Sequence, residues 1–228
     1  MALRKIPQLS IGTKSFEMIT FFTADHHFGH ANILKYEDAM RRNAHGGRFQ
    51  TVEKMDEFLI DQWNATVSPG DTVYHLGDLS YKLHTIKEIL PYLNGSITLI
   101  VGNHDPFFKK MHNGHEQQTT AREQAMQVGF AGLHIEHFMT IAGIGLVQLS
   151  HFPYKPHKDA PEHDQRYLEL RPKPGKEAVL LHGHVHSQWL EQTLPGLPPM
   201  LNVGVEMWEM RPVSEAQIVE QYRKGSRP

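Results

Sequence analysis

Residues 180–188 read LLHGHVHSQ and place three histidines, His182, His184 and His186, directly after an apolar run that begins at Ala178. Alternation at every second residue is typical of a strand or a strand end, where alternate side chains share one face. Histidine is the most common metal ligand in proteins and the usual acid or base near neutral pH. The question is therefore whether other strands end in side chains of the same kind.

Four further apolar segments, 16–23, 71–76, 96–101 and 143–150, are predicted strands, and each ends in side chains that can bind a metal. In open α/β sheets ligands bind outside the carboxyl ends of the strands, so we expect these ends to converge. Turns favour Asp and Gly, but turn chemistry alone rarely gives five such ends in one chain. The polar residues that follow the five strands are Asp25, His26, His27, Asp78, Asn103, His104, Asp105, His151, His184 and His186.

The order of elements predicts an α/β core whose later strands form or extend a second sheet. Helical periodicity or polarity predicts helices at 51–66, 83–93, 116–128 and 214–222. After about residue 133 most segments read as strands, namely 133–141, 143–150, 178–184 and 200–208. The proline-rich stretch 153–176 has no periodicity, and loops of that length are usually functional or mobile.

Composition limits the class of protein. The chain has 228 residues, of which 39% are hydrophobic, and we expect a single domain over 1–228. It has no long apolar run and no signal-peptide pattern, so we expect neither a membrane span nor a membrane partner. Cysteine is absent, which excludes disulfides and thiolate metal sites and predicts a cytoplasmic location. A net charge of −2 does not indicate a nucleic-acid partner, although a local basic patch remains an alternative.

The candidate ligands predict the kind of metal. Imidazole mixed with carboxylate suits Mn, Fe, Zn or Ni, whereas Ca and Mg prefer oxygen ligands alone. Seven ligands are too many for one tetrahedral zinc, but they suit two ions that share a bridging carboxylate. The candidate metal ligands are Asp25, His27, Asp78, Asn103, His151, His184 and His186.

The five blocks together resemble the signature of the calcineurin-like metallophosphoesterases, in that family's order across residues 25–186. More loosely, DHHFGHANI, VYHLGD and NVGVEMWEMRPV resemble a small bacterial or phage branch of the superfamily. The resemblance implies a four-layer α/β/β/α sandwich of two mixed sheets. The blocks are Asp25-x-His27, Gly77-Asp78, Gly102-Asn103-His104-Asp105, His151 and Gly183-His184-x-His186.

The resemblance also implies a role for each residue. One ion, divalent or trivalent, is held by Asp25, His27, Asp78 and His186, and a second by Asp78, Asn103, His151 and His184. Asp78 bridges the two ions, with Mn as the first choice of metal and Fe, Zn or Ni as alternatives. His104 is the general acid, and Asp105 orients it.

The implied reaction is hydrolysis of a phosphate ester by a hydroxide that bridges the two metals. We expect a small phosphodiester or a nucleotide as substrate, because the chain is small and not basic. The alternatives are a nuclease with the same chemistry and a non-catalytic phosphoesterase-like scaffold. Asn103, His30 and Arg48 are candidates for substrate contact. Arg41 is a further candidate for holding phosphate, with a solvated loop position as its alternative.

Overall fold

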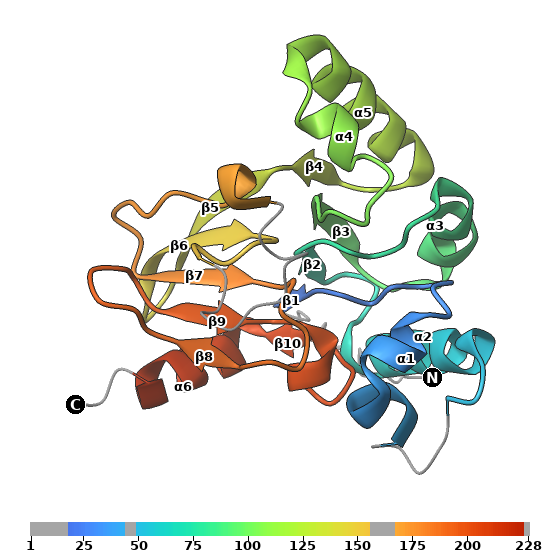
Figure 1. Cartoon of the computed structure of the whole chain (residues 1–228), viewed down its shortest axis with the longest axis horizontal. Coiled ribbons are helices and arrows are strands. Elements are labelled where there is room, and N and C mark those ends of the chain that lie inside the picture. Colours follow the sequence, from blue (N-terminus) through green and yellow to red (C-terminus); the bar gives the residue numbers. More distant parts are fainter. Residues whose placement is uncertain (1–17, 44–48, 156–166, 226–228) are drawn as a thin grey trace, which may run out of the picture.

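The computed structural model describes residues 18–43, 49–155 and 167–225, which contain two five-stranded mixed sheets (Figure 1). The first sheet has the order β10-β1-β2-β3-β4. Strands β1 to β4 are parallel, and β10 pairs antiparallel with β1 at the edge. These strands are β1 (Thr20–Thr23), β2 (Thr72–His75), β3 (Ser96–Ile100), β4 (Gly132–His134) and β10 (Val213–Ser214).

The second sheet has the order β5-β6-β7-β9-β8. Its central strands β6, β7 and β9 are parallel, and the two edge strands are antiparallel to their neighbours. The carboxyl ends of β6 and β7 therefore lie at the same edge of this sheet. Its strands are β5 (Glu136–Ile141), β6 (Gly145–Ser150), β7 (Val179–His182), β8 (Glu191–Gln192) and β9 (Met200–Asn202).

The longer helices begin where the sequence supplies a cap or an acidic first turn. The Thr51 hydroxyl accepts a hydrogen bond from the Lys54 N–H at 3.4 Å and so caps α2. None of the helices in the described part of the chain is long and apolar enough to cross a membrane. The helices are α1 (Ile33–Tyr36), α2 (Val52–Thr66), α3 (Leu83–Ile89), α4 (Phe108–Met111), α5 (Gly114–Val128) and α6 (Glu215–Gly225), with shorter helical turns η1 (Asp38–Asn43), η2 (Leu90–Tyr92) and η4 (Val205–Met207).

Alternation along the strands of the first sheet builds two cores. Phe21 packs with the helices α2, α3 and α5, whereas its neighbour Phe22 packs against the second sheet. The same division separates Leu99 from Ile100 on β3. Burial of each large apolar side chain favours the folded state by about 1.5–3 kcal/mol relative to leaving it in water. The molecule is therefore a sandwich with helices outside the first sheet and the second sheet against its other face (Figure 1).

The predicted mixed α/β sandwich of two sheets is confirmed. The segment 133–141, however, is two strands in place of one. The chain leaves the first sheet after His134 and enters the second at Glu136, so that β4 pairs with β3 and β5 pairs with β6. The segment 200–208 also divides, into β9 and the turn η4. Of the loop 153–176, residues 156–166 lie outside the described ranges.

Candidate metal centre

The loops that follow β1, β2, β3, β6 and β7 meet where the two sheets join, in the middle of Figure 1. Backbone hydrogen bonds join them, from Asp25 N–H to the Gly77 carbonyl at 3.0 Å and from His27 N–H to the Asp78 carbonyl at 3.0 Å. Between the sheets, the backbone N–H of His184 donates to the Asp25 carboxylate at 2.9 Å. The predicted convergence of the five strand ends is thus present in the structure.

Two glycines permit this close approach of the loops. A Cβ atom at Gly77 would lie 2.5 Å from His151 Nδ1, and Gly77 has a φ of +90°. A Cβ atom at Gly183 would lie 2.6 Å from Asp25 Oδ2. Any side chain at either position would collide with a candidate ligand, so the geometry of the centre requires glycine there.

The first group of candidate ligands is Asp25, His27 and His186, whose ligand atoms all lie within 4.8 Å of one another. The rings of His27 and His186 stack with centroids 5.0 Å apart. His27 is buried, and neither of its ring nitrogens has a hydrogen-bond partner in the described structure. A buried imidazole without partners is costly unless something else binds it, and a metal ion in this group would do so.

The second group is Asp25, Asp78 and His151, again within 4.8 Å of one another. Two further predicted ligands lie beside His151. Its Nε2 is 3.0 Å from Oδ1 of Asn103 and 3.2 Å from Nδ1 of His184. All four side chains predicted for the second ion, those of Asp78, Asn103, His151 and His184, therefore surround one small volume.

The tautomer of His151 indicates what that volume holds. Its Nδ1 lies 2.8 Å from the carbonyl oxygen of Leu76, which can only accept a hydrogen bond. Burial, together with the neighbouring His184, lowers the pKa of His151 well below its usual value, so the ring is neutral. The lone pair of Nε2 then faces Asn103 Oδ1 and Asp78 Oδ2, which are also acceptors. Acceptors that face one another fit a cation between them.

Asp78 lies between the two groups. Its Oδ2 is 3.5 Å from His27 Nε2 and 3.5 Å from His151 Nε2. Asp25 also belongs to both groups. The residues Asp25, His27, Asp78, His151 and His186 could therefore hold a metal ion. That Asp78 bridges two ions stays a prediction.

The candidate ligands have an unusual backbone. Seven described residues other than glycine have positive φ, and five of these are predicted ligands. Such conformations cost on the order of 1–3 kcal/mol each and concentrate at functional sites. The turn at 182–186 is one example, because β7 ends at His182 and the next residues do not continue the strand alternation expected from the sequence. The five are Asp25 (61°), His27 (53°), Asp78 (59°), His184 (72°) and His186 (46°).

The centre concentrates acidic groups where water is excluded. Burial raises the pKa of Asp25 to about 7, and the Glu206 carboxylate adds to the rise. Burial and the negative charges of Asp105 and Asp25 raise the pKa of Asp78 well above its usual value. A bound divalent ion would be the largest local charge and would favour the ionised carboxylates.

A buried Arg–Glu pair supports the first group, and the sequence analysis did not find it. Arg41 in η1 donates from Nε to Glu206 Oε1 at 2.8 Å and from Nη1 to the His26 carbonyl at 2.9 Å. Its Nη2 also donates to the Asp25 carbonyl. Glu206 Oε1 lies 3.1 Å from His186 Nδ1. This arrangement leaves Nε2 of His186 available to a metal and fixes the ring by a carboxylate behind it.

Arg41 is fully buried, so both interpretations offered for it, a phosphate clamp and a solvated loop residue, are wrong. Burial opposes charging of Glu206, but Arg41 and His186 lower its pKa to about 2. Burial likewise opposes charging of His186, but Glu206 and Asp25 raise its pKa to about 9. The three side chains form one buried ionic network. Arg48 lies outside the described residues.

His104 lies at the open side of the centre, with 33% of its side chain exposed. Its backbone N–H donates to Asp78 Oδ1 at 2.8 Å, and its Nε2 lies 4.0 Å from Asp78 Oδ2. His30 lies next to it, with ring centroids 6.2 Å apart, and 5.5 Å from the ring of His27. The proposed acid and the proposed substrate contact are thus brought together beside the ligands.

Asp105 ties together the loops that carry the ligands. Its carboxylate accepts from the backbone N–H of Gly102 at 2.7 Å, of Asp78 at 2.9 Å and of Leu79 at 2.9 Å. These bonds fix the loops after β2 and β3 against each other. That Asp105 also orients the His104 ring stays a prediction.

The remaining polar residues near the centre hold its backbone in place. His182 is buried, with Nδ1 2.7 Å from the Gly183 carbonyl and its ring 4.6 Å from the ring of Trp189. Asn202 donates to the His186 carbonyl at 2.8 Å and to the Trp189 carbonyl at 3.0 Å. Asn202 therefore fixes the turn that presents His186.

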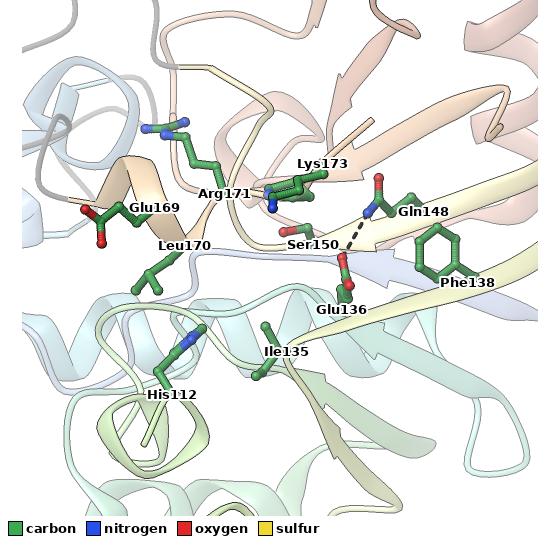
Figure 2. A pocket seen from close by; sticks show the side chains of 11 residues that line it. His112, Ile135, Glu136, Phe138, Gln148, Ser150, Glu169, Leu170, Arg171 and Lys173 are labelled. Atoms are coloured by element: carbon green, nitrogen blue, oxygen red, sulfur yellow. Dashed lines mark hydrogen bonds between the residues drawn. The ribbon is translucent and has the colours of Figure 1, made fainter. Parts of the chain in front are cut away.

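A separate pocket of about 310 Å³ lies at the edge of the second sheet (Figure 2). On one wall of it, formed by β5 and β6, Gln148 Nε2 donates to Glu136 Oε2 at 2.9 Å. Ser150, which lines the pocket, directly precedes His151. None of the predicted ligands lines this pocket, so it is distinct from the centre.

Comparison with known proteins gives relatives of similar length. No protein-family model matches the chain. An uncharacterized protein of Methanocaldococcus jannaschii, MJ1445, is 31% identical over 90% of this chain and 92% of its own length. The gene 66 protein of Mycobacterium phage L5 is 29% identical over 83% of this chain and 87% of its own.

The fold also has a solved counterpart. A protein of unknown function from Aquifex aeolicus, AQ665, has a TM-score of 0.59 and 22% identity over 90% of this chain and 99% of its own. That likeness concerns the fold alone. By the extent and identity of the sequence match, the chain belongs to the same family as the archaeal protein MJ1445.

Proposed function

We propose that the protein is a phosphoesterase of the calcineurin-like type that uses two metal ions. The observation that carries the proposal is the convergence of two adjacent ligand groups, with Asp25 in both and Asp78 between them. In the first group the His27 imidazole has no hydrogen-bond partner in the described structure, and in the second group acceptors face one another. Sites of this composition suit Mn, Fe, Zn or Ni, with Mn as our first choice.

A pair of bound divalent ions would neutralise a phosphate and lower the pKa of water from 15.7 to about 7. Asp25, His27, Asp78 and His186 would hold one ion, and Asp78, Asn103, His151 and His184 the other. Glu206 keeps His186 in the orientation that presents Nε2. Asp105 accepts hydrogen bonds from both loops and so holds the loop of Asp78 against the loop of Asn103.

His104 supplies the proton that the leaving oxygen needs. It lies beside Asp78 yet is partly exposed, so a substrate phosphate at the ligands would meet its imidazole. General acid assistance of this kind is typically worth ~10²–10⁴-fold in rate. His30, beside His104 and His27, would contact the substrate.

The test is hydrolysis of bis-p-nitrophenyl phosphate and of p-nitrophenyl phosphate by the protein reconstituted with Mn²⁺. We expect hydrolysis of at least one, and faster cleavage of the first would indicate a phosphodiesterase. Metal uptake without hydrolysis of either ester would contradict the proposal and favour a non-catalytic scaffold.

A further inference from the structure

We propose that the exposed tyrosines Tyr36 and Tyr81 bind the nucleobase of a phosphoester whose phosphate lies at the metal centre. This inference rests on the proposed function and deepens it by naming the substrate class. It begins from the two loops that carry His30 and Tyr81. The Phe28 N–H donates to the Leu79 carbonyl at 2.9 Å, and the Ser80 hydroxyl donates to the Phe28 carbonyl at 2.8 Å.

These hydrogen bonds hold the loops of His30 and Tyr81 together, and four aromatic rings, including that of Tyr36 at the end of α1, lie at the open side of the centre. The ring of Tyr81 lies 4.8 Å from that of His104 and 5.7 Å from that of His30. The ring of Tyr36 lies 6.5 Å from that of His30. His104 in turn lies 5.3 Å from the ring of the candidate ligand His27. A continuous series of rings therefore leads from the ligands to the surface.

The two tyrosines at the outer end of this series are open to solvent. Tyr36 is 72% exposed and Tyr81 is 55% exposed, although both are large and partly apolar. Both rings lie near that of His30, whose Nδ1 is buried without a hydrogen-bond partner in the described structure. A ligand that covers these rings and offers polar atoms at its edge would satisfy both features.

A nucleobase has these properties. Its faces stack on aromatic side chains whatever the base, and its edge carries donors and acceptors. Because Tyr81 touches His104, which would protonate the leaving oxygen, the base would belong to the leaving alcohol. A sugar or alkyl alcohol has no aromatic face to stack on the tyrosines, so the site would favour nucleosides over simple alcohols.

The test is calorimetric titration of the Mn²⁺-loaded protein with adenosine 5′-monophosphate and with ribose 5-phosphate, which has a hydroxyl at C1 in place of the base. We expect the nucleotide to bind about tenfold more tightly, and tenfold corresponds to ~1.4 kcal/mol. Tyr81→Leu should reduce this preference to about twofold, whereas Tyr81→Phe should keep it because the ring remains. Tyr92, which is 68% exposed on η2, supplies the matched control Tyr92→Leu, and this variant should keep the preference.

Equal affinity of the wild type for the two ligands would overturn the inference, and so would a preference that survives Tyr81→Leu. Circular dichroism identifies a variant that fails to fold, and Tyr36→Leu then replaces it in the same titration. If neither ligand binds while bis-p-nitrophenyl phosphate is still hydrolysed, the inference fails and the proposed function stands. If neither binds and no ester is hydrolysed, both fail.

Discussion

His186 Nδ1 lies 3.1 Å from Oε1 of Glu206, a carboxylate that is fully shielded from water. The same oxygen accepts a hydrogen bond from the buried guanidinium of Arg41. The imidazole is therefore fixed from behind by a charge whose own position is fixed by a third side chain. Carboxylates placed in this way behind a histidine ligand orient the ring and raise its affinity for metal.

Glu206→Gln should weaken Mn²⁺ binding by about 10–100-fold, since the amide keeps the shape but loses the charge behind His186. Calorimetric titration of the metal-free protein measures this. Glu209→Gln is the matched control, because the Glu209 side chain is 85% exposed and should not affect binding. An unchanged affinity in Glu206→Gln would show that Glu206 does not act on the metal site.

Asp78→Asn should remove both activity and most of the bound metal. Asp78 Oδ2 lies 3.5 Å from His27 Nε2 and from His151 Nε2, so its charge serves both ligand groups. Loss of a supporting residue typically lowers metal affinity or activity by about 10–100-fold, and loss of a ligand should cost more. We therefore expect metal affinity and activity each to fall by more than about 100-fold. Mass spectrometry of bound metal and a hydrolysis assay measure the two effects. Wild-type activity in this variant would refute the assignment of Asp78.

His104→Ala should keep the metal content and lose turnover. Its ring lies beside Asp78 at the open side of the centre, where it would meet a leaving oxygen. We expect a loss of ~10²–10⁴-fold, greatest for alkyl esters and least for nitrophenyl esters, whose leaving groups need no proton. His84→Ala, at a side chain that is 80% exposed on α3, is the control. Loss of metal from His104→Ala would identify His104 as a ligand.

The sequence predicted that the candidate ligands lie together because each follows an apolar strand, and the ends of parallel strands meet at one edge of a sheet. It predicted the interval 133–141 less well. Every part of that run favours a strand, so the sequence shows no break within it. Only the pairing of β4 with β3 and of β5 with β6 shows that the chain changes sheets between His134 and Glu136. Local pattern cannot specify which strand becomes the partner.

The supporting residues could not be found in the same way. Arg41 and Glu206 are 165 positions apart, and neither directly follows a predicted strand end. Glu206 lies in the stretch NVGVEMWEMRPV, but nothing in that stretch pairs it with Arg41. An arginine in a polar segment is usually exposed, so burial of Arg41 is a tertiary effect. The left-handed backbone at His184 and His186 could not be predicted from the sequence either. The local pattern indicated strand alternation, which would have placed both side chains on one face.

Metal binding should stabilise the fold. The site buries carboxylates and unpartnered imidazole nitrogens that a cation would satisfy. At a Mn²⁺ concentration of about 100 times the Kd, binding to the folded state alone should raise the free energy of unfolding by ~2.7 kcal/mol. For a chain of this size that is roughly 5–10 °C in Tm. Thermal unfolding with EDTA and with Mn²⁺ measures the shift, and Asp78→Asn should show little of it. Equal Tm values for the wild type in the two conditions would contradict a metal site.

Asp56 should make the protein less stable as the pH rises. It lies in α2, and its Oδ2 accepts the Gly29 N–H at 2.9 Å, behind the loop of His27 and His30. Burial raises its pKa from 3.8 to about 7. Between these two values the unfolded chain is ionised while the folded protein keeps the proton. The stabilising contribution is therefore complete below about pH 4 and lost as the pH rises through about 7.

Asp56→Asn keeps an oxygen that can accept the Gly29 N–H and cannot ionise. Its Tm relative to wild type should therefore rise between pH 4 and pH 8, when both proteins are measured in EDTA to exclude linkage to metal. Asp61→Asn makes the same change at an exposed position of the same helix and should show a smaller pH dependence. If the difference in Tm between Asp56→Asn and wild type is the same at both pH values, the pKa of Asp56 is not raised by folding. The hydrogen bond from Gly29 would then offset the effect of burial, and the prediction would be wrong.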